Sequence, residues 1–250
     1  MTQDAKTESG STPPRARKRA HKESVREASI ERILDAAEDL FAEFGYHGFT
    51  LKQVAARIGV SPTLIHYHFN GKESIFDAVW ARKVPASTRA RLEALRRYGE
   101  EAGDEVTVEG ALNAWIDPDL KLHLDDRDYW ASIGKINAQA NSAAGWGATK
   151  MNSYFNPVAE ALVALLRKAM PQCDDETIFW GFHFLSGAMT HNMARTGRLD
   201  ELSGGLCSSD DFASIRKHMV TFMAAGFKAI CAASKHPGTD GRPTGMREQY

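Results

Sequence analysis

The sequence predicts an all-α protein with two parts, a small three-helix head of the helix-turn-helix type and a larger helical body. Apolar residues recur at spacings of three and four along most of the chain, which is the period of an amphipathic helix. No run alternates with a period of two between turn signals, as a strand would. The 250 residues are enough for two unequal domains.

The composition excludes several classes of protein. With 31 Lys and Arg against 32 Asp and Glu, the chain is not a wholly basic, histone-like binder, although a local basic patch is compatible with it. The longest apolar run, Ala161 to Leu166, is far shorter than the roughly 20 residues of a membrane span. The first 22 residues lack the apolar segment of a secretory signal. Three scattered cysteines favour a reducing cytoplasm, and we expect no disulfide scaffold, metal site or cofactor.

The two ends of the chain have the composition of tails. Residues 1–23 are predicted to be a disordered arm, and residues 236–250 a flexible tail. Within residues 15–26 there are six basic residues and one acid, Glu23. Such a run is either a solvated arm or a segment that contacts DNA. The basic residues considered for contact are Arg15, Arg17, Lys18 and Arg19.

The head is predicted to span residues 24–80 and to begin with a long helix. Ser24 and Glu27 have the spacing of a capping box, and Gly45 is a suitable stop. One face of this helix is apolar and is expected to be buried; it carries Ile33, Ala37, Leu40, Phe41 and Phe44.

Two short helices follow, separated by a tight turn. Thr50 is a suitable N-cap for the first of them, with Gln53 at the box position, and Gly59 ends it. Ser61 caps the second, and Pro62 occupies the first helical position, where its missing N–H has no consequence. A short helix, a tight turn and a second short helix together predict a helix-turn-helix.

The exposed side of the second short helix is suited to contact with DNA. It presents Thr63, His66, Tyr67 and His68, and no acid occurs from Leu51 to Gly71. In a helix-turn-helix the second helix lies in the major groove, so its outer side chains reach base edges and phosphates. The absence of acids suits a surface that meets phosphates.

The string TLKQVAARIGVSPTLIHYHFNGKESIFDAV, preceded by ILDAAEDLFAEFGY, resembles the DNA-binding head of TetR-family transcriptional regulators. The resemblance implies that Thr50, Tyr67 and Lys72 hold phosphates and that Pro62, Thr63 and His66 lie near base edges. The family often has Gly and Tyr at positions 63 and 66, so the departures here leave the operator sequence unreadable. The further candidates for DNA contact are Lys52, Gln53, Ser61 and His68.

The body, residues 81–235, is predicted to consist of helices near residues 87–102, 106–116, 127–140, 149–170, 174–197 and 210–233. Pro85 and Pro118 are among the expected breaks. An acidic run that includes Asp117 and Asp119 is interpreted as a solvated loop, because it lacks the pattern of a calcium site.

By the same resemblance, the body binds an effector and forms a homodimer through its last two long helices. The candidate interface residues are Trp180, Phe184, Met219, Phe222 and Met223, with a monomer core as the alternative. Residues 179–205 and 222–227 also resemble a branch of the family that includes regulators responding to long-chain fatty acids.

The middle helices are rich in aromatic residues with polar residues between them, as a small-ligand pocket requires. The candidate pocket residues are Trp115, Trp130, Asn137, Tyr154 and Phe155; ordinary aromatic core packing is the alternative. The histidines His123, His183 and His191 fit no metal-ligand spacing and are interpreted as ordinary core or surface residues.

We therefore expect a cytoplasmic homodimer that binds an inverted-repeat DNA operator and has no membrane partner. The expected activity is repression released by a small hydrophobic effector. A ligand-activated regulator and a constitutive DNA-binding protein are alternatives. An all-helical enzyme is a further alternative, but the chain contains none of the hydrolase, zinc-protease, dinucleotide or phosphate-loop motifs.

Overall fold

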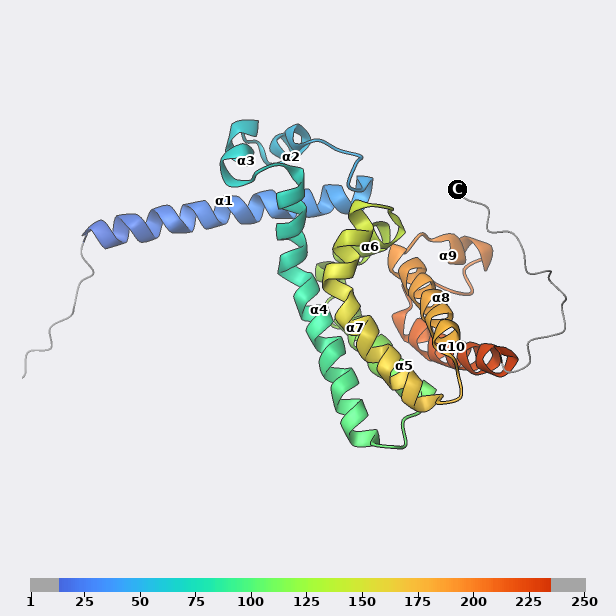
Figure 1. The fold of residues 1–250 in the computed structure, drawn as a ribbon. Helices are drawn as coiled ribbons and strands as arrows, with labels where there is room; N and C mark the ends of the chain where they lie inside the picture. The colour runs from blue at the N-terminus through green and yellow to red at the C-terminus, as the bar shows by residue number, and fades with distance from the viewer. Residues whose placement is uncertain (1–13, 235–250) are drawn as a thin grey trace, which may run out of the picture. The chain divides into compact units, whose positions relative to one another are not determined.

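The computed structural model describes residues 14–234, which form ten helices and no strand (Figure 1). The all-α prediction is therefore confirmed for these residues. The chain divides after Val79 into two compact units, called here the head and the body. The proposed tail at 236–250 and most of the proposed arm lie outside the described residues.

Helix α1 spans Pro14–Phe44 and begins ten residues before Ser24, where the sequence placed its start. Residues 14–23 are thus helical in the structure, and Ser24 and Glu27 lie inside the helix. The reason is local: this segment is rich in Ala, Arg, Lys and Glu, which are good helix formers, and Pro is well tolerated in a first turn.

The buried face of α1 is centred on Phe41, whose ring lies 4.8 Å from that of Phe49 and 5.1 Å from that of Phe76, both edge to face. Ile33, Ala37 and Leu40 are buried beside it, as expected. Phe44 was expected on this face but is exposed, because it is the last residue of the helix and projects beyond the head's core.

The helix-turn-helix consists of α2 (Leu51–Ile58) and α3 (Pro62–His68). The backbone N–H of Thr50 donates to Gln53 Oε1 at 2.7 Å, which completes the expected capping box. Gly59 ends α2 at a φ of 69°, a left-handed conformation that favours glycine. Ser61 and Pro62 then start α3 as the sequence predicted.

Two prolines that were expected to break helices lie inside them. Helix α4 runs from Lys72 to Ala102 through Pro85, and α5 runs from Val108 to Asp125 through Pro118. An interior proline costs a helix about 3 kcal/mol. Large buried neighbours such as Val84 and Ile116 offset this cost, because burial of one such side chain contributes about 1.5–3 kcal/mol.

The rest of the body follows the predicted pattern closely. It consists of α6 (Arg127–Ser142), α7 (Trp146–Ala169), α8 (Asp175–Ala194) and α10 (Phe212–Ser234), with one unpredicted short helix, α9 (Arg198–Leu202). Helix α10 packs against α5 and α8, and α6 packs against α7 and α8. Within residues 14–234, no helix combines the length and the apolar character that crossing a membrane requires.

Candidate DNA-binding surface and internal pocket

The outer side of α3 carries the side chains that the sequence assigned to DNA contact. Pro62, Thr63, His66 and Tyr67 are exposed, and Tyr67 is 73% exposed. Ile65, on the opposite side of α3, is fully buried and anchors the helix to the head. The helix therefore presents a hydrogen-bonding face on a fixed support.

The other candidates for DNA contact are also exposed. They are Thr50, Lys52 and Gln53 at the start of α2, and Ser61 in the turn before α3. His68 is half-buried, and its Nδ1 atom has no hydrogen-bond partner among the described residues. Two contacts brace α2 on α1: Arg32 donates to the Ile58 carbonyl at 2.8 Å, and Arg57 pairs with Asp39 at 3.3 Å.

Lys72 differs from the other candidates because it is engaged within the head. Its ammonium group donates to the Phe49 carbonyl and lies 3.8 Å from the centre of the Phe49 ring. Partial burial lowers the pKa of Lys72 below its ordinary value. A phosphate contact by this residue would share the ammonium group with the Phe49 carbonyl.

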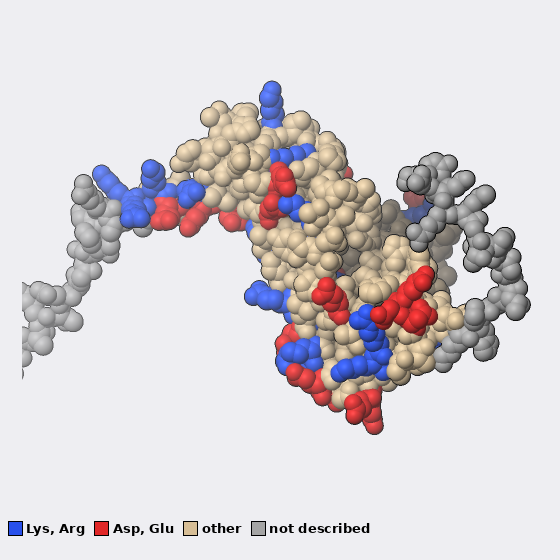
Figure 2. Space-filling view, viewed as in Figure 1, with Lys and Arg blue, Asp and Glu red and all other residues tan. Residues whose placement is uncertain are grey.

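The N-terminal part of α1 is basic in the structure. Lys and Arg side chains gather at this end of the helix (Figure 2), and Lys18 and Arg19 are exposed. The side chains of Arg15 and Arg17 lie outside the described residues. Because the segment is helical, any contact with DNA would come from one side of a helix rather than from an extended arm.

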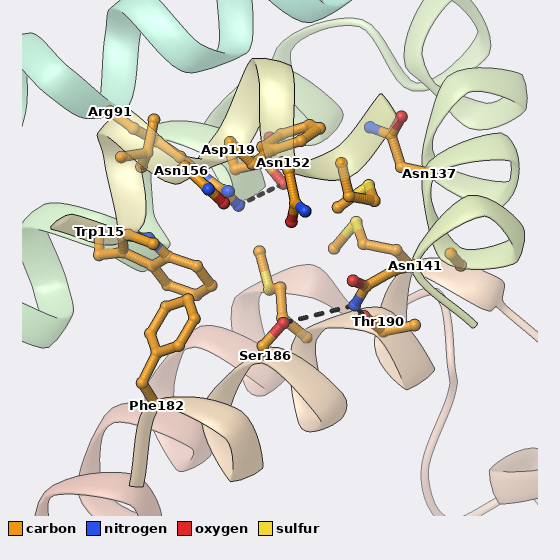
Figure 3. A pocket seen from close by; sticks show the side chains of 17 residues that line it. Arg91, Trp115, Asp119, Asn137, Asn141, Asn152, Asn156, Phe182, Ser186 and Thr190 are labelled. Carbon is orange, nitrogen blue, oxygen red and sulfur yellow. Dashed lines mark hydrogen bonds and ion pairs between the residues drawn. The ribbon is translucent and has the colours of Figure 1, made fainter. Parts of the chain in front are cut away.

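The body contains a cavity with a volume of about 190 Å³ between α4, α5, α6, α7 and α8 (Figure 3). Three of the five candidate pocket residues, Trp115, Asn137 and Phe155, line it. The other two candidates do not. The Trp130 ring lies 6.1 Å from the ring of His123, and the Tyr154 ring packs edge to face on Trp80 at 5.4 Å.

A buried ion pair forms one wall of this cavity. Arg91 Nη2 lies 2.9 Å from Asp119 Oδ2, and Ser87 Oγ donates to Asp119 Oδ1 at 2.6 Å. The Arg91 guanidinium also lies 4.5 Å from the centre of the Trp115 ring. The acidic run was interpreted as a solvated loop, and for Asp119 that interpretation is wrong: helix α5 continues through it and turns this carboxylate inward.

Arg91 and Asp119 were not predicted as pocket residues. The remaining polar lining residues are Asn141, Asn152, Asn156, Ser186 and Thr190. The one signal available for Arg91 was its place on the apolar side of a helix, where a charged side chain requires a partner.

Three buried polar atoms of the lining have no hydrogen-bond partner among the described residues. They are Arg91 Nε, Trp115 Nε1 and Asn137 Oδ1. Trp115 and Asn137 lie on opposite sides of the cavity (Figure 3). Each of these atoms has less than 1 Å² of accessible surface, so the three atoms are packed against protein and do not face the open space of the cavity.

Helices α8 and α10 leave large apolar side chains uncovered. Trp180, Phe184 and Phe222 are exposed, and the first two stack with ring centres 6.0 Å apart. Met223 is half-buried, whereas Met219 is buried in the body's own core. Three exposed aromatic residues on two helices that pack together indicate an interaction surface.

His123 is a buried histidine that belongs to the core rather than to a cluster of ligands. Its ring stacks on Phe212 with centres 5.2 Å apart, and burial lowers its pKa below the ordinary value. In the described part of the chain, no three His, Cys, Asp or Glu side chains are grouped so that they could hold a metal ion.

Two family models match the chain. Residues 33–79 match the DNA-binding model described as bacterial regulatory proteins of the tetR family, and residues 113–226 match the tetracyclin repressor-like C-terminal domain. The first match contains the whole helix-turn-helix, and the second contains most of the residues that line the cavity.

Relatives and solved structures agree with these models. The HTH-type transcriptional regulator RutR of Escherichia coli (strain K12) is 38% identical over 166 residues, which cover 54% of this chain and 78% of that protein. The regulator SrpR of Pseudomonas putida is 35% identical over 96 residues, which cover 38% and 43% of the two chains.

In fold, the chain resembles HlyIIR, a hemolysin II transcriptional regulator, with a TM-score of 0.52 at 20% identity over 77% of this chain and 97% of that one. It also resembles the fatty acid degradation regulator FadR of Bacillus halodurans, with a TM-score of 0.50 at 15% identity over 79% and 95%. The combination of a tetR-type helix-turn-helix, a matching helical body and a closely similar regulator shows that this chain belongs to the TetR family of transcriptional regulators.

Proposed function

We propose that the protein is a homodimeric repressor that binds an inverted-repeat operator through α3 and releases it when a small molecule occupies the cavity of the body. The observation that carries the proposal is the outer face of α3, which is exposed, free of acids and rich in hydrogen-bonding groups. A face of this kind on the second helix of a helix-turn-helix suits entry into the major groove.

The roles of the head's residues follow from their chemistry and position. Tyr67 and Lys52 hold phosphates, which fixes the position of the head on the duplex without reading sequence. Thr63 and His66, one turn apart on the exposed side of α3, reach base edges and set sequence preference. The basic start of α1 adds phosphate contacts through Lys18 and Arg19.

Dimer formation through α8 and α10 is supported by their uncovered aromatic residues. A second copy would bury Trp180, Phe184 and Phe222, which are the large anchors that such interfaces use. A Cβ atom added at Gly187 on α8 or at Gly226 on α10 would have no other atom within 4 Å. A partner's helices therefore have room for close approach. Two heads in a dimer would contact half-sites about 34–36 Å apart.

The cavity supports control by a small molecule. Its wall includes Ser186 and Thr190 on α8, the helix that also carries the exposed aromatic residues. A ligand that repositions α8 would alter the dimer and thereby the spacing of its heads. The change in operator affinity is limited by the ligand's preference between the two states of the dimer.

Binding rather than catalysis accounts for the molecule's features. The relatives that match are transcriptional regulators. The two charged residues that line the cavity, Arg91 and Asp119, form an ion pair with each other.

The proposal is tested by recovering bound fragments from sheared genomic DNA of the source organism. Enrichment of a few sites with inverted half-repeats is expected. If folded protein enriches no fragment at moderate salt, operator binding is refuted.

Variants then assign roles to single residues. Lys52→Ala removes one phosphate contact from each protomer, so the salt dependence of binding should weaken by about two in log–log slope. Lys121→Ala is the matched control, because Lys121 is an exposed lysine of the body. An unchanged slope in the Lys52→Ala variant would contradict the phosphate assignment.

Sequence preference is tested separately. Thr63→Ala and His66→Ala should change which bases are preferred, whereas Tyr67→Phe should weaken binding to all sequences alike. Tyr129→Phe, which removes an exposed tyrosine hydroxyl from the body, is the control for Tyr67→Phe. Uniform loss of affinity in the Thr63→Ala and His66→Ala variants would remove these residues from the base-reading surface.

A further inference from the structure

The first part of α1 extends beyond the packed core of the head. The helix is anchored from about its middle, where Ile33 and Ala37 are buried and Arg32 donates to the Ile58 carbonyl at 2.8 Å. Residues 18–28, called here the α1 extension, are exposed at every position whose side chain the structure describes. Because α1 is one continuous helix, its anchored part fixes the direction in which the side chains of the extension point.

The charges of the extension are sorted into two rows. Since each residue turns the helix by about 100°, four basic side chains lie within about 100° of one another around the axis. They are Lys18, Arg19, Lys22 and Arg26, called here the basic row. The acidic row, about a third of a turn away, consists of Glu23, Glu27 and Glu31.

The basic row lies on the same side of α1 as the helix-turn-helix. Figure 2 shows the basic side chains of this segment mainly along its upper edge and the acidic ones along its lower edge. In the same view α2 and α3 lie above α1 (Figure 1), and all three helices belong to one compact unit. A duplex in contact with α3 would therefore meet the basic row and not the acidic one.

The sorting of charges does not stabilise the helix by itself. Residues four apart are neighbours on a helix surface, where opposite charges stabilise and like charges destabilise. Lys22 has a cation four residues away on either side, and Glu27 likewise has an acid on either side. The one pair of opposite charge at this spacing within the extension is Arg19 with Glu23. A polyanion beside the basic row would relieve the repulsion among its cations.

The composition of the extension points to DNA as that polyanion. A helix that lies on a membrane surface or pairs in a coiled coil needs an apolar stripe, and Val25 is the one large apolar residue among residues 18–28. Lys and Arg side chains are the usual partners of DNA phosphates. The neighbouring helix-turn-helix also presents no acid from Leu51 to Gly71, so a single duplex can approach both surfaces without meeting a negative charge.

We propose that the basic row binds phosphates of duplex DNA beside the bases that α3 contacts, and that it adds affinity without adding sequence preference. The row is about 12 Å long from Lys18 to Arg26, at about 1.5 Å per residue. This length corresponds to about three to four base pairs. The role rests on the proposed function, which places the duplex against α3; it adds Lys22 and Arg26 to the contact surface and assigns the contact to one side of the helix.

The decisive variant moves the charges without changing their number. Combining Lys22→Glu with Glu23→Lys, and Arg26→Glu with Glu27→Arg, preserves the composition and net charge of the chain but places two acids in the basic row. The Kd of the full chain for a short duplex of arbitrary sequence is measured between about 50 and 200 mM salt. Affinity at the lowest salt should fall more than about tenfold, and the log–log slope should weaken by about two for each protomer bound.

A pair of charge-removing variants provides the matched control. Lys22→Gln with Arg26→Gln should weaken the slope by the same amount, because Gln keeps helix propensity but loses the charge. Arg97→Gln with Lys121→Gln removes two exposed cations from the body and should leave the slope unchanged. The role of the basic row is overturned if these two double variants have equal slopes, or if the variant with exchanged charges binds like the original chain while circular dichroism shows equal helicity.

The outcomes separate this role from the proposed function. The exchange of charges should lower affinity for the recovered operator and for arbitrary duplex by the same factor, because phosphate contacts carry no sequence information. Unchanged binding by the exchanged variant, with operator recovery by the original chain, refutes the basic row and keeps the proposed function. Weaker duplex binding by the exchanged variant, with no operator recovered by the original chain, supports the basic row and refutes sequence-specific regulation. Tighter binding of the original chain to phosphatidylserine vesicles than to duplex, at equal phosphate concentration, would assign the row to a membrane and overturn the proposal.

Discussion

Replacement of Asp119 by Asn tests how much the ion pair in the cavity wall contributes to stability. Asp119 is 9% exposed, and Arg91 is 5% exposed. The change keeps the shape of the side chain but leaves the guanidinium buried without a counter-charge. Removing one partner of a buried pair costs about 3–5 kcal/mol. At about 2–4 °C per kcal/mol for a domain of this size, the unfolding midpoint should fall by about 6–20 °C.

A matched control lies two residues away on the same helix. Asp117 pairs with Arg216 at 2.6 Å, but the two side chains are 29% and 54% exposed. An exposed pair contributes at most about 1 kcal/mol, so Asp117→Asn should lower the midpoint by only a few degrees. Circular dichroism during heating and during urea unfolding measures both variants.

The reasoning is refuted if the two variants lose the same stability. A double variant separates charge from shape. Arg91→Met with Asp119→Leu removes both charges and should recover most of the stability lost in Asp119→Asn, because an apolar replacement of a buried pair is often neutral or stabilising. If the double variant is less stable than Asp119→Asn, the loss comes from packing.

Three further predictions concern the body. Phe222→Asp places a charge on the proposed dimer face, where Phe222 is 74% exposed, so light scattering should detect a monomer of unchanged helicity; a persistent dimer would contradict the assignment. Burial lowers the pKa of His123 in the folded state, so its contribution to stability is fully present above the unfolded pKa of about 6.5 and is lost as the pH falls below it. The free energy of unfolding can be measured with urea from about pH 7.5 to about pH 5.5. It should depend less on pH in His123→Gln than in His183→Gln, by up to about 1.4 kcal/mol per pH unit. Gly181→Ala would place a Cβ atom 2.2 Å from Phe227 Cε1 and should lower stability by about 1–3 kcal/mol in thermal unfolding, whereas no loss would show that the Phe227 ring moves freely.

The head was predictable because its signals are local. Thr50 with Gln53, Gly59, and Ser61 with Pro62 each fix a helix end within a few residues of the chain, and the structure has these ends as predicted. Its one misplaced boundary, the start of α1, lies where good helix formers continue past a suitable cap at Ser24.

The body was less predictable because tertiary packing overrides local preference there. Pro85 and Pro118 each disfavour a helix locally, but α4 and α5 continue through them because the neighbouring residues are buried. The cavity was harder still to predict from the sequence. Arg91 and Asp119 are far apart in the sequence and belong to different helices, so their pairing becomes visible only when α4 and α5 pack together. Trp130 and Tyr154 show the converse, since aromatic character alone does not distinguish a cavity wall from the core.

The division after Val79 has a consequence for how such a protein diversifies. The residues proposed to read DNA lie before this boundary, and the cavity is lined entirely by residues after it, from Arg91 to Met193. Five helices contribute to the lining, so a single substitution alters one part of the wall and leaves the others in place. Under the proposed function, a lineage can therefore acquire a response to a new ligand while it keeps its inherited target genes, or keep the ligand and move to new genes.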